Sequence, residues 1–232
     1  MRTNAMKKCA VGAMLFGGAL GLAQAASAGT VTFLATAPGG GTYAEVSSLY
    51  ITGLYPGGNA GVTGLGNTFT ASGGSTSTGG GFQTAITATV NSTALGFELQ
   101  STRSGSTAAQ WNYPSIMLSR VFSVTGGSVD WTGSLAANET GYIIPNYYQI
   151  WQLDANGELQ YDAEFNQIGL EFARQGSGTF GGTLAEGNYV LYVEGRVNNG
   201  SDVPIATFAV PAPGAIALLG VAGLVGLRRR RS

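Results

Sequence analysis

Two carboxylates, Asp162 and Glu164, stand two residues apart and form the candidate pair for acid–base chemistry in this sequence. Paired carboxylates are the general acid–base route that remains, because the chain has no histidine and so no Ser-His-Asp triad, Cys-His dyad or imidazole base. Glycoside hydrolysis uses such a pair, but its two carboxyl groups must come from opposite sides of a cleft. Side chains two residues apart on one strand share a face instead. We therefore expect no catalytic residues and no enzymatic activity.

Calcium is the candidate ion, because an acidic stretch of chain without lysine supplies oxygen ligands. Asp154, Asn156 and Glu158 have the spacing that opens an EF-hand loop. The sixth and twelfth positions of that loop would be Leu159 and Phe165, where the motif needs glycine and glutamate. Turn chemistry explains the aspartate and asparagine without a metal. We expect no cofactor, and Ca²⁺ bound by residues distant in sequence stays open as an alternative.

Aromatic rings are the other chemical signal, since a sugar ring can stack on tryptophan or tyrosine while polar neighbours bind its hydroxyl groups. Trp111 and Tyr113 lie in a predicted loop and are the candidate saccharide contacts. Trp131 and Trp151 lie on predicted strands, so we expect both of them in the core. The chain has no basic patch, phosphate-binding glycine loop or nucleic-acid motif, so we expect no nucleic-acid partner.

The elements that position these residues are predicted to be β-strands of one domain over 29–200. The composition is rich in glycine, serine and threonine, which makes long helices hard to place. The clearest signal is a hairpin, in which the runs 147–153 and 158–165 flank an Asn-Gly turn over 154–157. Further strands are expected at 31–34, 46–54, 82–90, 95–100, 116–125, 129–135, 168–174 and 189–197. Short strands without helical crossovers predict an all-β fold, an antiparallel β-sandwich with a jelly-roll-like strand order.

Three stretches lack a clear strand pattern. The low-complexity segments 56–66 and 70–81 are expected to be surface loops. Residues 201–209 are expected to form a stalk between the domain and the C-terminal segment.

Charge is distributed unevenly along the chain. Residues 29–210 hold twelve acidic side chains against four arginines, and the two ends hold the other seven positive charges. The formal net charge of −1 therefore conceals an acidic body with two basic ends. Such a body is expected to avoid anionic partners.

The N-terminus has the three-part layout of a secretory signal peptide. Three positive charges precede an apolar run over 9–22, and a stretch of small residues follows over 23–28. We expect signal peptidase to cut after Ala28, with Ala26 and Ala28 as the small residues of the site; a cut three residues earlier is the alternative. The one cysteine, Cys9, would leave with the peptide, so the mature body would have no disulfide.

The C-terminus predicts a short membrane helix with a defined orientation. An apolar stretch over 214–227 follows a Val-Pro-Ala-Pro motif formed by Val210, Pro211, Ala212 and Pro213. Four arginines end the chain: Arg228, Arg229, Arg230 and Arg231. Arginine excess marks the cytoplasmic side of a membrane helix, so the body is expected outside the membrane.

This combination of export signal, Val-Pro-x-Pro motif, brief apolar helix and terminal arginine cluster resembles PEP-CTERM proteins. Ala212 stands where the family's name motif has glutamate, a variant similar to the Val-Pro-Ala-Pro tails that also occur in the family. The resemblance, which covers the C-terminal tail over 210–232, implies an exported bacterial surface protein whose tail is recognised by an exosortase-type sorting enzyme. It also implies an association with exopolysaccharide and biofilm production.

These observations predict an exported, non-enzymatic protein of the cell surface or extracellular matrix, held at the membrane by its tail and then released or transferred. Its expected partners are the sorting enzyme, signal peptidase, the inner membrane for a limited time, and exopolysaccharide. A carbohydrate-binding β-sandwich module in the same location is the alternative, and a glycoside hydrolase is a weaker one.

Overall fold

The computed structural model describes residues 29–52, 60–63, 68–76, 83–105, 115–136, 146–196 and 203–211. These residues form fifteen β-strands, and no helix occurs among them. Thirteen of them build two antiparallel sheets that pack face to face around a common core. The predicted all-β sandwich is confirmed.

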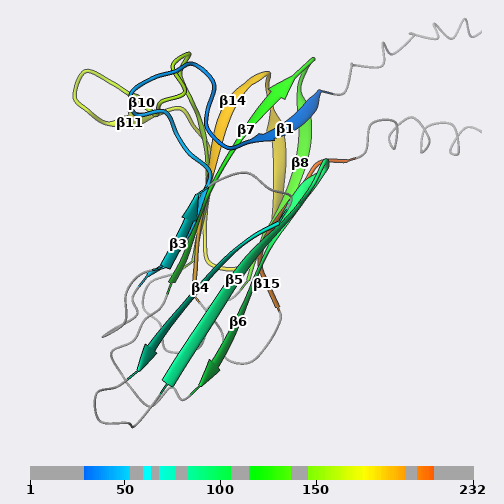
Figure 1. Ribbon diagram of the computed structural model, residues 1–232. Coiled ribbons are helices and arrows are strands. Elements are labelled where there is room, and N and C mark those ends of the chain that lie inside the picture. The colour runs from blue at the N-terminus through cyan, green and yellow to red at the C-terminus, as the bar shows by residue number, and fades with distance from the viewer. Residues whose placement is uncertain are drawn as a thin grey trace, which may run out of the picture.

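Sheet 1 contains seven of the described strands. Its order is β12 (Leu170–Gln175), β9 (Tyr147–Gln152), β14 (Gly187–Arg196), β7 (Ser115–Thr125), β2 (Ser48–Thr52) and β3 (Ala60–Thr63), and β1 (Thr30–Leu34) also pairs with β7. Sheet 2 has the order β13 (Gly178–Leu184), β8 (Val129–Leu135), β15 (Val203–Ala209), β6 (Gly96–Gly105), β5 (Gln83–Thr93) and β4 (Thr68–Thr76). A separate small hairpin consists of β10 (Gln160–Tyr161) and β11 (Gln167–Ile168), which lies at one end of the sandwich (Figure 1).

Strands β1 and β2 lie end to end along the same edge of β7, and the loop 35–47 leaves the sheet between them. The fully buried Ser47 fills the gap in this interrupted strand. Its Oγ accepts a hydrogen bond from the Val121 amide at 2.9 Å and donates one to the Leu34 carbonyl oxygen at 2.6 Å. The backbone groups at the break are therefore paired, which allows a loop to leave the sheet without exposing unsatisfied amides to the core.

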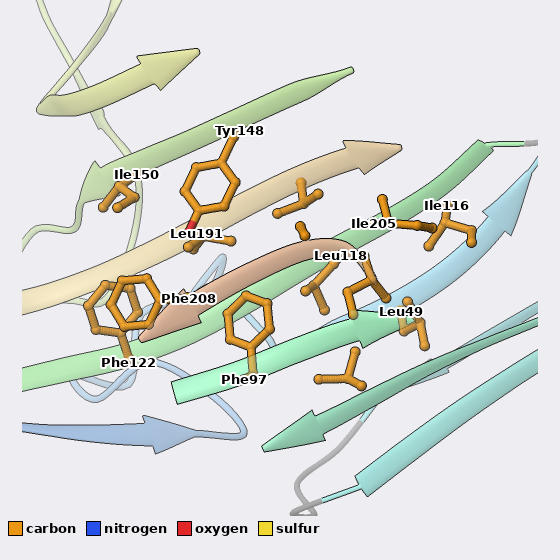
Figure 2. Packing of buried hydrophobic residues seen from close by; sticks show 14 of the residues in the cluster. Leu49, Phe97, Ile116, Leu118, Phe122, Tyr148, Ile150, Leu191, Ile205 and Phe208 are labelled. Atoms are coloured by element: carbon orange, nitrogen blue, oxygen red, sulfur yellow. The ribbon is translucent and has the colours of Figure 1, made fainter. Parts of the chain in front are cut away.

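Alternation along the strands places one continuous apolar core between the sheets. On β7, Ile116, Leu118 and Phe122 are fully buried and belong to this core. Figure 2 shows the ring of Phe122 beside that of Phe208 from the opposite sheet, with centroids 5.3 Å apart, and Phe97 stacks on Phe208 at 6.1 Å. Each such side chain stabilises the fold by about 1.5–3 kcal/mol through burial.

The same core encloses an arginine. Arg120 follows the inward alternation of β7, is 1% exposed, and its Nε and Nη1 have no hydrogen-bond partner. Its Nη2 donates to Ser92 Oγ at 3.3 Å, and its Cζ lies 4.9 Å from the ring centroid of Phe33 and 5.3 Å from that of Phe69. Desolvation lowers the pKa of Arg120 to about 10, so the guanidinium is still charged at neutral pH. Cation–π contacts thus replace a counter-charge here.

The predicted stalk over 201–209 is wrong where the structure describes it. Residues 203–209 form β15, which lies in the middle of sheet 2 between β8 and β6. Ile205, Ala206 and Phe208 of this strand are buried in the core. The domain therefore extends as far as Val210, whose amide donates to the Leu95 carbonyl oxygen at 2.7 Å.

The two stretches predicted as loops also contain strands. β3 falls within 56–66, and β4 covers much of 70–81. On β4, Phe69 and Ala71 are buried, whereas Thr70 and Thr89 of β5 share a hydrogen bond between their hydroxyl groups at 3.1 Å on the outer face. This glycine- and serine-rich segment is stabilised as a strand because apolar residues alternate on its inner face and hydroxyl groups pair with β5 on its outer face.

The expected strand over 158–165 is wrong beyond Tyr161. The Asn-Gly turn is present, and Leu153 forms a β-bridge with Leu159, but the chain turns a second time at 162–166. The strand that pairs with β9 here is β12, not the segment 158–165. The β10–β11 hairpin lies between β9 and β12 in the sequence. Phe165 occupies the left-handed region with φ 62°, which ends the alternation on which the prediction depended.

Candidate ligand-binding face

Several residues of the predicted functional sites lie outside the described residues. These are the candidate saccharide contacts Trp111 and Tyr113, the cleavage residues Ala26 and Ala28, Ala212 and Pro213 of the sorting motif, and the terminal arginines. Val210 and Pro211 are described and follow β15 directly. The expectation that Trp131 and Trp151 belong to the core is confirmed, since they are 3% and 9% exposed.

The candidate calcium ligands Asp154, Asn156 and Glu158 form a turn that is held together by hydrogen bonds to the Asp154 carboxylate. Asp154 Oδ1 accepts hydrogen bonds from the amides of Asn156 at 2.8 Å and Glu158 at 2.9 Å. These bonds, led by that from Glu158, lower the pKa of Asp154. Among the described residues no group of three acidic, histidine or cysteine side chains could hold a metal ion.

Asp162 repeats this geometry eight residues later. Its carboxylate accepts bonds from the Asn166 side chain at 3.0 Å and from the amides of Asn166 and Glu164 at 2.8 and 3.0 Å. The Asn166 side chain contributes most to the lowered pKa of Asp162. These hydrogen bonds give Asp162 a role in closing the turn over 162–166.

The cross-strand register gathers a row of side chains on the outer face of sheet 1. Tyr147 on β9 pairs with Glu194 on β14, Glu194 with Met117 on β7, Met117 with Tyr50 on β2, and Tyr50 with Gly61 on β3. We call this row the tyrosine face. The strands position it because their alternate residues are locked in the core.

Tyr50 is held flat on this face. A Cβ atom on Gly61 would collide with the Cδ1 and Cε1 atoms of the Tyr50 ring, so the ring lies directly over the glycine. The side chain is nevertheless 41% exposed, and Met117 beside it is 45% exposed. One side of the aromatic ring therefore packs on backbone while the other is open to solvent, which is the geometry of a stacking platform.

A second row beside the tyrosine face is polar. It runs from Gln149 through Tyr192 and Ser119 to Ser48. The Tyr192 hydroxyl donates to Glu45 Oε2 at 2.6 Å. Burial is the main cause that raises the pKa of Tyr192, and this hydrogen bond is the second. Gln149 and Ser48 are the half-buried polar side chains of this row, whereas Ser119 is buried and the Tyr192 hydroxyl is already bonded to Glu45.

Loops cover the remaining part of the outer face of sheet 1. The loop 35–47 and the turn 154–158 are joined by hydrogen bonds from the Gly41 amide to the Asn156 carbonyl oxygen at 3.1 Å and from the Glu45 amide to the Gly157 carbonyl oxygen at 2.9 Å. Beneath them lies a second apolar cluster of Ala37, Val121, Trp151, Leu153 and Val190. Figure 1 shows the loop and the β10–β11 hairpin together at this end. The tyrosine face begins where this cover ends.

The face has an acidic to neutral character. Glu194 is the one charged side chain in the row, and the described part of the chain contains no lysine. A ligand that is neutral, hydroxylated and able to stack on a ring suits these groups better than a phosphate or nucleic acid. The sequence prediction missed this site because Tyr50 and Tyr147 are nearly a hundred residues apart. The signal available in the sequence was one outward-facing tyrosine on each of the predicted strands 46–54 and 147–153. Only the register of the strands between them brings the two tyrosines into one row.

Comparison with known proteins adds no relative: no family model, curated protein or solved structure matches the chain. Among the described residues, no helix has the length and apolarity needed to span a membrane.

Proposed function

We propose that this protein is an exported, non-enzymatic component of the bacterial cell surface or matrix, and that its β-sandwich binds polysaccharide on the tyrosine face. The observation that carries the binding role is Tyr50 lying flat over Gly61 in a row with Met117, Glu194 and Tyr147. Sugar rings present apolar C–H faces to aromatic rings and hydroxyl groups to carboxylates and amides. The tyrosine face offers ring contacts and the Glu194 carboxylate, and the Gln149 amide lies in the polar row beside it.

The spacing of the two tyrosines favours a polymer over a single sugar. Tyr147 and Tyr50 are separated by three strand-to-strand steps, which amounts to about 14 Å. That distance accommodates more than one ring of a chain laid across the strands. Glu194 and Met117 lie between the two tyrosines, where one hydrogen-bond acceptor and one adaptable apolar side chain would contact the intervening unit.

The strand order supports the finer assignment of a jelly roll. The eight strands β6, β7, β8, β9, β12, β13, β14 and β15 divide into the layers β6-β15-β8-β13 and β7-β14-β9-β12. Each strand of the first half pairs with its counterpart in the second half, β6 with β15, β7 with β14, β8 with β13 and β9 with β12. A long hairpin wound into two sheets has this order, and lectin domains are among the proteins built this way. β4 and β5 extend one layer, and β1, β2 and β3 extend the other.

Delivery is proposed to depend on the two ends of the chain. The signal segment and the Val210–Pro211–Ala212–Pro213 motif with its arginine cluster have the layout expected of a substrate for signal peptidase and an exosortase-type enzyme. Mass spectrometry of the protein from its native cells tests this. A mature species that lacks both ends is expected, and an intact Arg228–Arg231 tail would contradict sorting by cleavage.

Affinity electrophoresis tests the binding role. The protein is run through gels that contain exopolysaccharide from the producing cells, and retardation is expected for the unchanged protein. Tyr50→Ala and Tyr147→Ala should each reduce retardation, whereas Tyr43→Ala, which removes an 81% exposed tyrosine from outside the face, should not. Trp111→Ala and Tyr113→Ala form a separate arm. Retardation lost only in that arm would assign binding to the loop that the sequence singled out.

A further inference from the structure

The two sheets differ in how their edges are protected. On sheet 1, β12 has a bulge between Leu170 and Phe172 and exposes Glu171 and Arg174, and β3 is four residues long. Bulges, charges and short length are the devices that keep an edge strand from pairing with another chain. Sheet 1 is therefore protected at its β12 and β3 edges, and its third described edge strand, β1, is only five residues long.

Strand β13, at one edge of sheet 2, has none of these devices. It pairs one for one with β8 over seven residues, from Gly178 opposite Leu135 to Leu184 opposite Val129, without a register shift. Its sequence, GTFGGTL, contains no charge and no proline, and five of its seven residues are exposed. Its outward row of backbone N–H and C=O groups is a template for another strand.

The other edge of sheet 2, β4, is also uncharged, but β2 and β3 pack against it across that side of the sandwich. At the β13 side, the contact between the sheets is made by side chains, with the rings of Phe172 and Phe180 5.0 Å apart. Among the described residues, the edge of β13 is therefore the more accessible of the two.

The sequence of β13 is complementary to itself. A two-fold axis at Gly181 would pair Thr179 with Thr183 of a second copy on the outer face, and Phe180 with Gly182 of that copy on the inner face. Threonine pairs across strands already stabilise this sheet, as between Thr70 and Thr89, and an aromatic ring packs well over a cross-strand glycine, as Tyr50 does over Gly61. Two-fold symmetry is also the commonest arrangement in homo-oligomers.

We infer that the protein self-associates through β13, whose edge pairs antiparallel with β13 of a second copy to make one continuous sheet. The seven-residue strand would contribute about six backbone hydrogen bonds to this junction. The tyrosine face lies on sheet 1 and stays uncovered in such a pair. The dimer would therefore present two tyrosine faces, and if these bind polysaccharide it could bridge two polymer chains.

Cysteine cross-linking of the full chain tests this register. In a Cys9→Ser background, copies with Thr179→Cys and copies with Thr183→Cys carry different tags and are produced together, then mildly oxidised. Directly opposed residues bring their Cβ atoms to about 5 Å, close enough for a disulfide, whereas two copies of Thr179→Cys would place their thiols four residues apart, about 13 Å. We expect the mixed dimer to exceed either homodimer at least fivefold.

Thr132→Cys is the matched control, because Thr132 lies on the same outer face opposite Gly181 but one strand inside the edge. It should not cross-link. Sedimentation velocity of Thr179→Lys and Thr132→Lys gives a second measurement that needs no oxidation: the first should be monomeric and the second dimeric at equal concentration, both with the circular dichroism of the unchanged protein. A monomer before any substitution, a dimer that persists in Thr179→Lys, or mixed-dimer yield no higher than that of the control would overturn the inference.

Discussion

The ring of Tyr50 lies over Gly61 on the neighbouring strand, where a Cβ atom would occupy the space of two ring carbons. The absence of one side chain thus fixes the orientation of another. A tyrosine that is already flat before ligand binding loses little side-chain entropy on binding, which raises affinity for a ring that stacks on it.

Gly61→Ala is expected to weaken polysaccharide binding without unfolding the protein. The new methyl group pushes the Tyr50 ring off the sheet, and the exposed ring can move at low cost in stability. We expect a fall in affinity of about tenfold, or ~1.4 kcal/mol, with a thermal midpoint close to that of the unchanged protein. Titration calorimetry beside circular dichroism measures both. Unchanged affinity would mean that the preset ring orientation plays no part in binding.

Arg120→Met is expected to stabilise the protein by about 1–2 kcal/mol. Burial of an arginine without a counter-charge is unfavourable, and methionine fills similar space without that cost, although the cation–π contacts are lost. Because the pKa of Arg120 is lower in the folded protein than its ordinary value, the unfolded chain binds this proton more tightly. The penalty is full below about pH 10 and diminishes as pH rises above that value. Urea unfolding at pH 7 compares the two proteins, with Arg120→Lys as the control that keeps the charge; a loss of stability in the methionine variant contradicts this account.

Two turns of similar geometry should respond in opposite ways to substitution at their left-handed residue. Phe165 has φ 62° and Gly157 has φ 77°. Phe165→Gly removes the cost of this conformation and should stabilise its turn by about 1 kcal/mol. Gly157→Ala should destabilise by a similar amount or more, because its Cβ would lie 2.7 Å from Ala37 Cβ and 2.8 Å from the Pro38 carbonyl oxygen. Amide exchange in the β10–β11 hairpin and thermal unfolding report the two effects, and equal signs would show that φ does not decide them.

The turns closed by Asp154 and Asp162 should loosen in acid. Hydrogen bonds lower the pKa of both groups from the ordinary 3.8, so they stabilise the folded state at neutral pH. This contribution is retained above 3.8 and is lost as pH falls through the lower folded pKa. Asp162→Asn should accelerate amide exchange at Asn166 at pH 7, with a smaller difference from the unchanged protein near pH 2. Glu164→Gln is the control, and an equal effect in it would contradict a specific role of Asp162.

The strands that could be predicted from sequence are those with alternating apolar residues between clear turns. β8 was predicted with its observed bounds, and β7 within one residue, because Val129, Trp131 and Leu135 alternate and Gly126 and Gly127 mark a turn before them. β15 was not predicted, and its second residue is Pro204, a residue type rarely found in a central strand. The structure places this proline at a register shift against β6, where the ladder is already interrupted.

The candidate site could not be predicted because it depends on register. Nothing in a single strand indicates that Tyr147 and Tyr50 lie in one row, since four strands must pair in a fixed order to align them. Asp162 and Glu164 were expected to lie on one face of a strand and not to be catalytic. The strand expectation is wrong, because Asp162 instead accepts hydrogen bonds that close a turn.

Titration of the protein with fragments of its own exopolysaccharide measures whether the tyrosine face binds saccharide. We expect binding with a defined stoichiometry, weakened at least about tenfold by Tyr50→Ala or Tyr147→Ala, and unaffected by Tyr43→Ala. Binding that is absent, or equally strong in all three variants, would contradict a saccharide-binding role for the tyrosine face.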